Sequence, residues 1–478
     1  MSDAHLGRPL VVDLDGTLIH TDTLHELALL LLRDKPYLVL LLPFWLLGGK
    51  VVLKKKLASA VQIDTASLPF NAQLIEWLEL QKKMGRKLVL CTATDRSIAK
   101  PIADQLNLFD EVIASNGNEN IAGENKARVL EARFGSKGFD YVGNSSADLA
   151  VWARAKQGVV VNASNHVATQ ARKLTEIVHL IPRKAKTLKT WIKTFRLHQW
   201  IKNLLIFVPI LAAHEIITRQ SGLYLLLAFL SFSLCASAVY IANDLFDLTS
   251  DRLHPHKRHR PFASGEVPVW QGIVLAPLLI FGSFFVASYV GGNFLPWLAV
   301  YFGLTCAYSW GFKRLVLIDC FILAILYTLR IVAGAAAVNI PLSFWLLALS
   351  IFLFLSLAFI KRYAELQLHL VNHVQKVSGR GYHLSDTSLV QQLGVTSGYA
   401  AVLVLALYLN SENILRLYRA PEMIWGAVPL LLLWISWMWL NAHRGLMHDD
   451  PIVFAIKDKT SIFIGALLIG VFVLASLW

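Results

Sequence analysis

The sequence predicts two structural classes in one chain: an N-terminal α/β domain with a parallel sheet, followed by an all-α membrane domain of nine transmembrane helices. Of the 478 residues, 55% are hydrophobic and only 16% are charged, whereas soluble domains average about 25% charged residues. Short apolar runs alternate with helical patterns up to about residue 180. From about residue 198, apolar stretches long enough to cross a bilayer recur.

Three segments near the N-terminus are predicted to be strands that run into polar loops. They are 10–18 (LVVDLDGTL), 87–95 (KLVLCTATD) and 139–149 (FDYVGNSSADL). Parallel α/β sheets gather such loops at the carboxyl ends of their strands, where these folds bind ligands. We therefore expect one α/β domain over residues 1–180, with the polar side chains of these loops at one edge of the sheet.

An apolar segment at 36–49 is flanked by charges and broken by Pro43. It is too short to span a bilayer comfortably. Two interpretations fit the sequence: a hairpin lying at the membrane surface, or a buried helix pair of the α/β domain. In either case we expect the surrounding segment, about 24–75, to form a cap on that domain.

Residues 181–200 form a basic linker between the two domains. Its apolar residues recur at helical spacing among lysines, which predicts an amphipathic helix docked on anionic headgroups. These apolar residues are Leu188, Trp191, Ile192 and Phe195.

Nine apolar stretches in the membrane domain, residues 201–478, are expected to cross the bilayer. The loops after the second, fourth, sixth and eighth stretches hold thirteen Lys and Arg, and the opposite loops hold three. By the positive-inside rule, the basic loops and the N-terminal domain face the cytoplasm, and the C-terminus lies outside the plasma membrane. The stretches are about 201–213, 222–242, 268–290, 295–311, 317–338, 342–360, 394–410, 422–440 and 461–477.

Charge and cysteine content exclude several classes of protein. The net charge of +13 is concentrated in membrane loops and the linker rather than in a separate basic module, so no nucleic-acid partner is expected. The four cysteines lack paired spacing, which argues against a zinc site or a disulfide framework. Acidic residues interrupt the N-terminal segment, so we expect no signal peptide.

Two carboxylates, Asp13 and Asp15, follow the first predicted strand in VVDLDGTL. Beyond the strand end both can turn into one loop, where one can attack phosphorus and the other can protonate the leaving oxygen. This segment resembles the DxDGT signature of the haloacid dehalogenase superfamily. The later motifs of that superfamily follow in order, at 92, in GENKARVL and in GNSSAD (143–148).

The resemblance implies a phosphatase-like site with one Mg²⁺. Asn144 stands where that family has Asp; its carbonyl oxygen still suits Mg²⁺, but one negative charge is lost. An alternative is therefore a non-catalytic, regulatory module. The implied roles are nucleophile and metal ligand for Asp13, general acid/base and metal contact for Asp15, phosphate hydroxyl for Thr92, neutralising lysine for Lys126, and metal loop for Asn144 and Asp148.

The second apolar stretch runs into NDLFDLTSDRLHPHKRHRPFASG (243–265). Asn243, Asp247 and Asp251 recur at four-residue spacing on one helix face, with Asp244 beside them. Carboxylates at the end of a membrane helix are costly without a partner, and Mg²⁺ bridging to a diphosphate is the partner that the pattern favours. The cations that follow suit phosphate oxygens; they are Lys257, Arg258 and Arg260.

This segment resembles the NDxxDxxxDxxHPxKxxRPxASG motif of the UbiA-type intramembrane prenyltransferase superfamily, which implies a second Mg²⁺ here. Ordinary members have another aspartate-rich motif after the sixth span. Here IKRYAELQLHL (360–370) supplies Lys361, Arg362 and one carboxylate, Glu365. Extra cations suggest a donor with a further phosphate, and KRYAEL with RLHQWIKNLLIFVPILAA (196–213) resembles the decaprenyl-phosphate phosphoribosyltransferase branch.

Further polar residues in the membrane domain are candidates for binding the substrate. Lys202 and Asn203 stand at the cytoplasmic start of the first stretch. Arg330 lies eleven residues, or about 16 Å along a helix, from Asp319 on the same face. An arginine inside a membrane is a functional candidate, although it can also be a structural partner for the carbonyls of a neighbouring helix.

The resemblance to this branch implies transfer of 5-phosphoribose from phosphoribosyl diphosphate to a polyprenyl phosphate. The N-terminal domain would then remove the 5-phosphate of the product. The alternative is a prenyltransferase that uses an isoprenyl diphosphate donor, with the N-terminal domain acting on a separate phosphate. Lys361 and Arg362 are the residues that distinguish these two interpretations.

Overall fold

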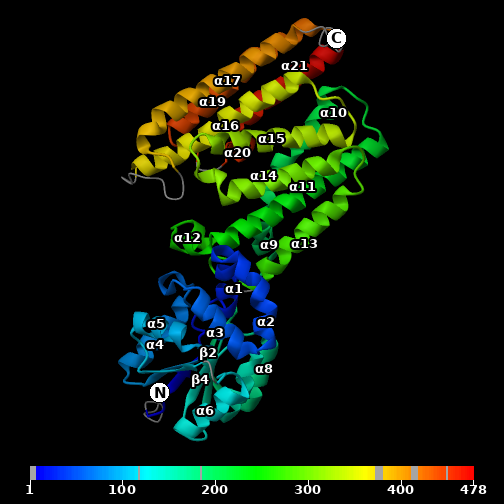
Figure 1. The fold of residues 1–478 in the computed structure, drawn as a ribbon. Coiled ribbons are helices and arrows are strands. Elements are labelled where there is room, and N and C mark those ends of the chain that lie inside the picture. Colours follow the sequence, from blue (N-terminus) through cyan, green and yellow to red (C-terminus); the bar gives the residue numbers. More distant parts are fainter. Residues whose placement is uncertain are drawn as a thin grey trace. The chain divides into compact units, whose positions relative to one another are not determined.

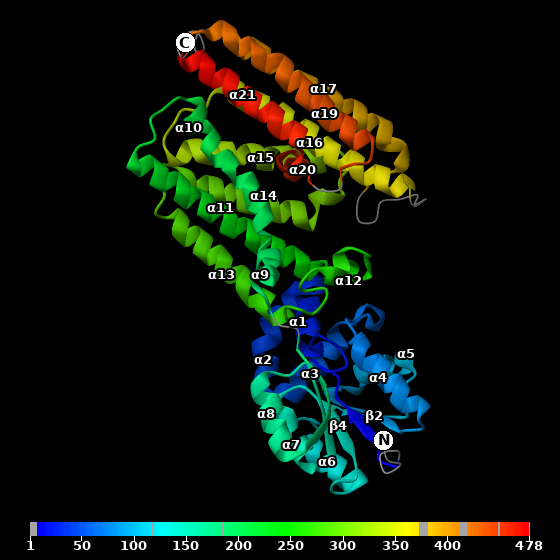
Figure 2. The same ribbon diagram turned by 180° about the vertical axis from the view of Figure 1, so that it is seen from behind.

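The protein is described here from a computed structural model, in which residues 7–116, 119–183, 186–371, 381–410, 418–447 and 450–477 are placed well enough to describe. Figures 1 and 2 show its fold from two sides. The chain forms two compact units. The first comprises Met1–Phe195 and Tyr240–Ala276, and the second comprises Arg196–Val239 and Pro277–Trp478.

The first unit contains a six-stranded parallel sheet in the order β3-β2-β1-β4-β5-β6. This confirms the predicted α/β class. The order reverses at β1, and in such sheets ligands bind outside the carboxyl ends of the strands at that switch point. The strands are β1 (Leu10–Val12), β2 (Leu88–Asp95), β3 (Glu111–Ser115), β4 (Asp140–Gly143), β5 (Gln157–Val161) and β6 (Glu176–Ile181).

Helices cover both faces of this sheet, because successive side chains of a strand point to opposite faces. Leu10 and Val12 of β1 belong to one apolar cluster, and Val11 belongs to another. In both views, α4 and α5 lie on one side of the sheet and α8 on the other, and Figure 2 shows α7 on the same side as α8 (Figures 1 and 2). The helices are α1 (Thr23–Asp34), α3 (Lys50–Ala60), α4 (Ala72–Lys83), α5 (Arg96–Leu106), α6 (Glu124–Phe134), α7 (Leu149–Arg154) and α8 (Asn165–Leu174).

The apolar segment at 36–49 forms a 3₁₀ turn, η2 (Pro36–Leu41), and a short helix, α2 (Leu42–Leu47). Neither contains a buried residue, and Leu47 is 85% exposed. The interpretation of this segment as a buried helix pair is therefore wrong. Pro36 and Pro43 limit the regular helix, because proline lacks the donor that a helix interior needs.

The linker contains a shorter helix than expected. α9 covers only Leu188–Thr194, because Arg196 adopts a left-handed backbone conformation with φ +51°, which a right-handed helix cannot include. A 3₁₀ segment, η5 (Leu197–Phe207), and the short helix α10 (Val208–Ala212) follow.

Seven helices among the described residues are long and apolar enough to cross a membrane, rather than the nine expected. The stretch at 201–213 forms η5 and α10, and the stretch at 295–311 forms α14 (Phe294–Trp310). α14 has 17 residues, or about 26 Å, which is less than a ~30 Å hydrocarbon core. The seven are α11 (Arg219–Phe246), α13 (Val269–Ala287), α15 (Ile318–Ala337), α16 (Phe344–Val371), α17 (Thr387–Leu409) with the turn η8 (Leu384–Asp386) before it, α19 (Ala427–His443) with the turn η9 (Pro421–Gly426) before it, and α21 (Lys459–Leu477). With η9, the α19 segment has 23 residues and is therefore longer than α14.

α15 is the central helix of the second unit. Its apolar window is 72% buried, the highest share among the seven, and it packs against η5, α14 and α16. Polar side chains on α15 are consequently enclosed by protein. The shorter elements used below are η4 (Ser146–Asp148), α12 (Leu248–Leu253), η6 (Lys257–His259) and α20 (Pro451–Lys457).

Candidate functional sites

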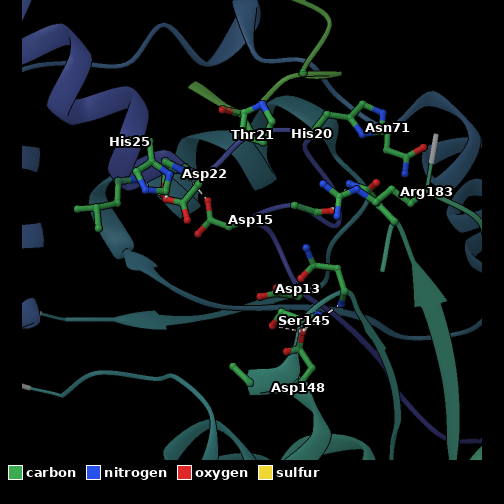
Figure 3. A pocket seen from close by; sticks show the side chains of 18 of the residues that line it. Asp13, Asp15, His20, Thr21, Asp22, His25, Asn71, Ser145, Asp148 and Arg183 are labelled. Carbon is green, nitrogen blue, oxygen red and sulfur yellow. Dashed lines mark hydrogen bonds and ion pairs between the residues drawn. The ribbon is translucent and has the colours of Figure 1, made fainter. Parts of the chain in front are cut away.

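The structure brings Asp13 and Lys126 together at the carboxyl end of β1. Lys126 Nζ donates to Asp13 Oδ1 at 2.7 Å and to the Tyr141 hydroxyl at 3.0 Å, and lies 3.9 Å from Asp148 Oδ1. Lys126 is buried in the first turn of α6, and its side chain reaches the residue that follows β1. Figure 3 shows Asp13 close to Ser145 and Asp148 of the loop after β4.

Asp15 is held by hydroxyl and amide donors rather than by a cation. Its Oδ1 accepts the Thr23 backbone N–H at 2.8 Å, and its Oδ2 accepts the Thr94 hydroxyl at 2.6 Å. The predicted phosphate ligand, Thr92, is fully buried, and its Oγ1 accepts the Thr94 N–H at 3.0 Å. Thr23 and Thr94 were missed by sequence reasoning; Thr94 stands in the same CTATD segment as Thr92.

Asp148 organises the loop after β4. Its Oδ2 accepts the N–H groups of Asn144 and Ser145 at 3.0 and 2.9 Å, and its Oδ1 accepts the Tyr141 hydroxyl at 2.6 Å. The Asn144 side chain lies over Gly16, where an added Cβ would sit 2.1 Å from Asn144 Nδ2. Gly16 has φ +72°, so glycine is needed both for the turn and for the approach of this amide.

Burial controls the charges of this site. It raises the pKa of Asp13 to about 7 against the opposing effect of Lys126, and it raises the pKa of Asp15 as well. For Lys126, burial lowers the pKa, but Asp13 and Asp148 outweigh it and the net shift is upward. Carboxylates confined in this way are stabilised by a cation.

The donors present suit Mg²⁺. No three His, Cys, Asp or Glu side chains in the described part of the chain gather closely enough to hold a metal by themselves. Mg²⁺ needs fewer, since it binds one or two carboxylates and keeps several waters. Asp13, Asp15 and the Asn144 amide line one cavity and present only oxygen ligands, whereas Asp148 is largely occupied by hydrogen bonds to its own loop.

The second candidate site lies where α11 ends. Asp247 is the N-cap of α12 with a non-helical backbone, although hydrogen bonds from Asp247 N to Asn243 O and from Asp251 N to Asp247 O keep the four-residue repeat. Asp244 and Asp251 are buried, whereas Asn243 and Asp247 are partly exposed. The predicted single helix face is therefore divided by a break in the helix.

Arg260 binds the two buried carboxylates of this loop. Its NH1 lies 3.1 Å from Asp244 Oδ1 and 2.6 Å from Asp251 Oδ2. Burial raises the pKa of Asp251 against the effect of Arg260. Lys257 and Arg258 are exposed on η6. Two carboxylates and one amide oxygen at the loop, with Asp247 beside them, are again a donor set that suits Mg²⁺.

A buried ion pair joins this loop to the α/β domain within the first unit. Arg252 NH1 and NH2 bind Glu26 Oε2 and Oε1 at 3.2 and 2.6 Å, and both side chains are 6% exposed. Glu26 also accepts the Thr21 hydroxyl at 2.6 Å. Sequence reasoning missed this pair, because neither residue belongs to a motif that pairs them.

In the second unit, Asp450 binds two of the predicted cations. Its Oδ2 lies 2.7 Å from Lys202 Nζ and 3.3 Å from Lys361 Nζ, and it accepts the Tyr327 hydroxyl at 3.2 Å. Burial raises the pKa of Asp450, but the two lysines outweigh it and hold that pKa well below its ordinary value. Asp450 caps α20 by accepting the Ile452 N–H. Asp450 was not among the site residues predicted from the sequence.

Arg330 lies on α15, three residues after Tyr327, and its hydrogen-bond partners are neutral. Nε donates to Asn203 Oδ1 at 2.8 Å, NH2 donates to the Tyr301 hydroxyl at 3.0 Å, and NH1 donates to the Leu326 carbonyl. The guanidinium also lies over the Tyr301 and Tyr327 rings. The structure thus brings the predicted residues Arg330 and Asn203 together.

Arg362 follows Lys361 in α16 but binds different partners. It is 1% exposed, its Nε lies 2.9 Å from Asp319 Oδ2, and it also binds Glu365. Asp319 in turn accepts the Tyr382 hydroxyl at 2.6 Å. Glu365 is therefore an ion-pair partner in this structure, and Asp319 pairs with α16 rather than with Arg330.

Comparisons with known proteins match two parts of the chain to two families. A model of the UbiA prenyltransferase family matches residues 205–465. A model of the haloacid dehalogenase-like hydrolases matches residues 10–152.

Three similar proteins cover different parts of the chain. Uncharacterized protein y4nM of Sinorhizobium fredii is 36% identical over 98% of this chain and 91% of its own length. A decaprenyl-phosphate phosphoribosyltransferase of Mycolicibacterium smegmatis is 34% identical over 56% of this chain and 86% of its own. The structure of a UbiA homologue from Archaeoglobus fulgidus bound to GPP and Mg²⁺ aligns with a TM-score of 0.46 and 16% identity, over 59% of this chain and 99% of that one. The chain therefore belongs to the UbiA prenyltransferase family, carries a haloacid dehalogenase-like domain at its N-terminus, and is distantly similar to decaprenyl-phosphate phosphoribosyltransferases.

Proposed function

We propose that this protein transfers 5-phosphoribose from phosphoribosyl diphosphate to a polyprenyl phosphate, and that its N-terminal domain then removes the 5-phosphate of the product. The 34% identity to a phosphoribosyltransferase over 86% of that protein supports the first step. The observation that carries the first step is a set of three cations in the second unit. Lys202 and Lys361 both bind Asp450, and Arg330 binds Asn203, the residue next to Lys202. This set favours a substrate with more phosphate groups than a prenyl diphosphate offers.

The proposal extends to the architecture. Residues 1–180 form the phosphatase domain with its cap at about 24–75, residues 181–200 form the linker, and residues 201–478 form the transferase domain. In this proposal the two short apolar segments also cross the membrane, so that nine segments put the two termini on opposite sides. The distribution of basic loops then predicts a cytoplasmic N-terminal domain and a C-terminus outside the plasma membrane.

In the transfer step, Asn243, Asp244, Asp247 and Asp251 would hold Mg²⁺, which offsets the charge of a diphosphate leaving group. Arg260, Lys257 and Arg258 contact diphosphate oxygens. Lys361 binds the 5-phosphate of ribose, while Arg362 fixes α16 through Asp319. Lys202, Asn203 and Arg330 orient the phosphate of the lipid. Positioning and charge neutralisation then suffice, with no protein nucleophile.

In the transfer step, one bond forms and one breaks at the anomeric carbon of ribose. An oxygen of the polyprenyl phosphate attacks the anomeric carbon of ribose, and the bond between that carbon and the diphosphate breaks. The diphosphate leaves with the electron pair, and a phosphodiester links lipid to sugar.

In the phosphatase step, the Asp13 carboxylate attacks the phosphorus of the 5-phosphate. Asp15, bound by Thr94 and the Thr23 N–H, donates its proton to the leaving ribose oxygen and then takes a proton from the water that hydrolyses the aspartyl phosphate. Thr92 and Lys126 bind phosphate oxygens, and Asp148 fixes the loop that presents Asn144. Mg²⁺ on Asp13, Asp15 and Asn144 would neutralise phosphate charge.

The test uses purified full-length protein with Mg²⁺, a polyprenyl phosphate and radiolabelled phosphoribosyl diphosphate, and follows label entering the organic phase. We expect Asp247→Ala to abolish transfer. Asp13→Ala should preserve transfer and leave a lipid product that retains its 5-phosphate.

Absence of transfer, under conditions in which the protein consumes an isoprenyl diphosphate, would contradict the phosphoribosyl assignment and support a prenyltransferase. A wild-type product that keeps its 5-phosphate would instead contradict only the phosphatase step and support a regulatory N-terminal domain.

A further inference from the structure

The carboxylate site opens into a cavity of about 1180 Å³, which is larger than a typical site for a drug-sized ligand. Asp13, Asp15, Lys126 and Asn144 lie on its lining, but much of the wall comes from two other segments of the first unit. One is Ile181–Pro182–Arg183, after β6, and the other runs from His259 to Trp270.

The wall contributed by 259–270 is anchored to the α/β domain. Gly265 has φ +73°, and a Cβ added there would lie 2.5 Å from His20 Cβ, so the two backbones are in close contact. Arg252 Nε donates to the Ala263 carbonyl at 3.2 Å while the same guanidinium binds Glu26. Lys186 Nζ donates to Gln271 Oε1 at 2.6 Å. This wall is therefore a fixed part of the cavity.

Arg183, on the wall formed by residues 181–183, is exposed and has no ion pair or hydrogen bond with the described side chains. Figure 3 shows it on the opposite side of Asp15 from Asp22 and His25. Apolar residues line the same cavity: Ile181 and Pro182, which precede Arg183 in the chain, and Val269 and Trp270 of the other segment. Trp270 is 46% exposed, although it is a large apolar side chain.

Two parts of the cavity therefore suit two different chemical groups. Asp13 and Lys126 form the end of the cavity that reacts with a phosphomonoester. A guanidinium and apolar side chains on the lining of one cavity suit a different group, namely an anion that is bonded directly to hydrocarbon. Arginine binds phosphate oxygens strongly, and the apolar side chains remove hydrocarbon surface from water.

We propose that Arg183 binds a second anionic group of the phosphatase substrate, and that Trp270 and its apolar neighbours contact the hydrocarbon attached to that group. This inference rests on the proposed phosphatase function. It assigns residues to the recognition of one substrate class, a sugar phosphomonoester joined to a prenyl chain through a phosphodiester. A soluble sugar monophosphate uses only the Asp13 end of the cavity.

Equilibrium binding tests this without turnover. Full-length Asp13→Asn protein, in detergent with Mg²⁺, is titrated with farnesyl-phosphoryl ribose 5-phosphate and, separately, with ribose 5-phosphate. Adding Arg183→Met should raise the Kd of the lipid-linked probe about tenfold, the size expected for one charged hydrogen bond, and leave the Kd of ribose 5-phosphate unchanged. Arg183→Lys should restore part of the loss. Trp270→Ala should weaken only the lipid-linked probe.

Arg172→Met is the matched control, because Arg172 is exposed on α8 outside the cavity lining; it should change neither Kd. Equal weakening of both probes by Arg183→Met, or no weakening of either, would overturn the inference. Wild-type protein that binds the two probes with the predicted difference but releases no inorganic phosphate would contradict the proposed phosphatase step and leave the second anion site standing.

Discussion

Each unit holds a charged side chain whose described hydrogen-bond partners are neutral. In the α/β domain, the Asp15 carboxylate accepts from the amide of Thr23 and from the hydroxyls of Thr23 and Thr94, whereas Asp13 and Asp148 lie beside the ammonium of Lys126. In the helical unit, the described acceptors of the Arg330 guanidinium are an amide oxygen, a carbonyl and a hydroxyl. A buried charge without a counter-ion is costly, so the first site favours a cation and the second favours an anion.

This difference separates the ways in which the two sites handle phosphate. The α/β site presents carboxylates, so phosphate can enter only with Lys126 and a metal ion offsetting their charge. Around Arg330 the protein itself carries the positive charge, since Arg330 has neutral partners and Lys202 and Lys361 share the single carboxylate of Asp450, so the phosphate of the proposed lipid substrate could bind there directly. Substitutions that alter one kind of charge should therefore change one activity and spare the other.

The largest effect is expected for Asp15→Asn. The amide keeps the size of the side chain but cannot exchange a proton, so phosphate release from the lipid product should fall by roughly a thousandfold, as for loss of a general acid/base. Phosphoribosyl transfer should be unchanged. A comparable loss of both activities would show that the two sites do not act separately.

A smaller effect is expected for Arg330→Gln. Removing the cation should raise the KM for polyprenyl phosphate by roughly 10- to 100-fold, corresponding to one or two charged hydrogen bonds, with phosphatase activity retained. The control is Arg219→Gln, since Arg219 is exposed at the start of α11. If KM for the lipid stays constant while protein yield falls, Arg330 is a structural partner for its helix neighbours.

The smallest effect is expected for Asn144→Asp. Restoring the missing carboxylate adds a negative charge beside Asp13 and Asp15, so the Mg²⁺ concentration at half-maximal phosphatase activity should fall by about tenfold, since charged ligands hold Mg²⁺ more strongly. The Mg²⁺ dependence of phosphoribosyl transfer should not move. An unchanged Mg²⁺ requirement for phosphate release would place the metal away from residue 144.

Local patterns predicted much of the α/β site. Asp13, Asp15 and Asn144 each follow a strand, and parallel strands deliver their carboxyl ends to one edge, so the motif order was enough to predict that they meet. The hydrogen-bond partners of Asp15 were less visible. Thr94 lies 79 residues away in the chain, and nothing in a single serine- or threonine-containing loop indicates which carboxylate it will contact.

The ends of two helices were predicted less well than the residues of the α/β site. The four-residue repeat of Asn243, Asp247 and Asp251 survives as backbone hydrogen bonds, but the helix ends at Phe246 and Arg260 draws Asp244 and Asp251 together. The linker helix likewise stops before Arg196. Spacing alone assumes an ideal helix, and packing against other segments decides where the backbone leaves it.

The sequence by itself determined the two classes of domain, the motif residues and seven of the nine stretches predicted to cross the membrane, because hydrophobic periodicity and reactive residue types are local properties. Only the tertiary structure decided that Asp450 binds Lys202, 248 residues away, that Glu26 binds Arg252 across 226 residues, and that Arg183 lies on the lining of the Asp13 cavity. Such contacts join side chains from distant segments, and their partners are set by the packing of whole elements, which leaves no periodic trace in the chain.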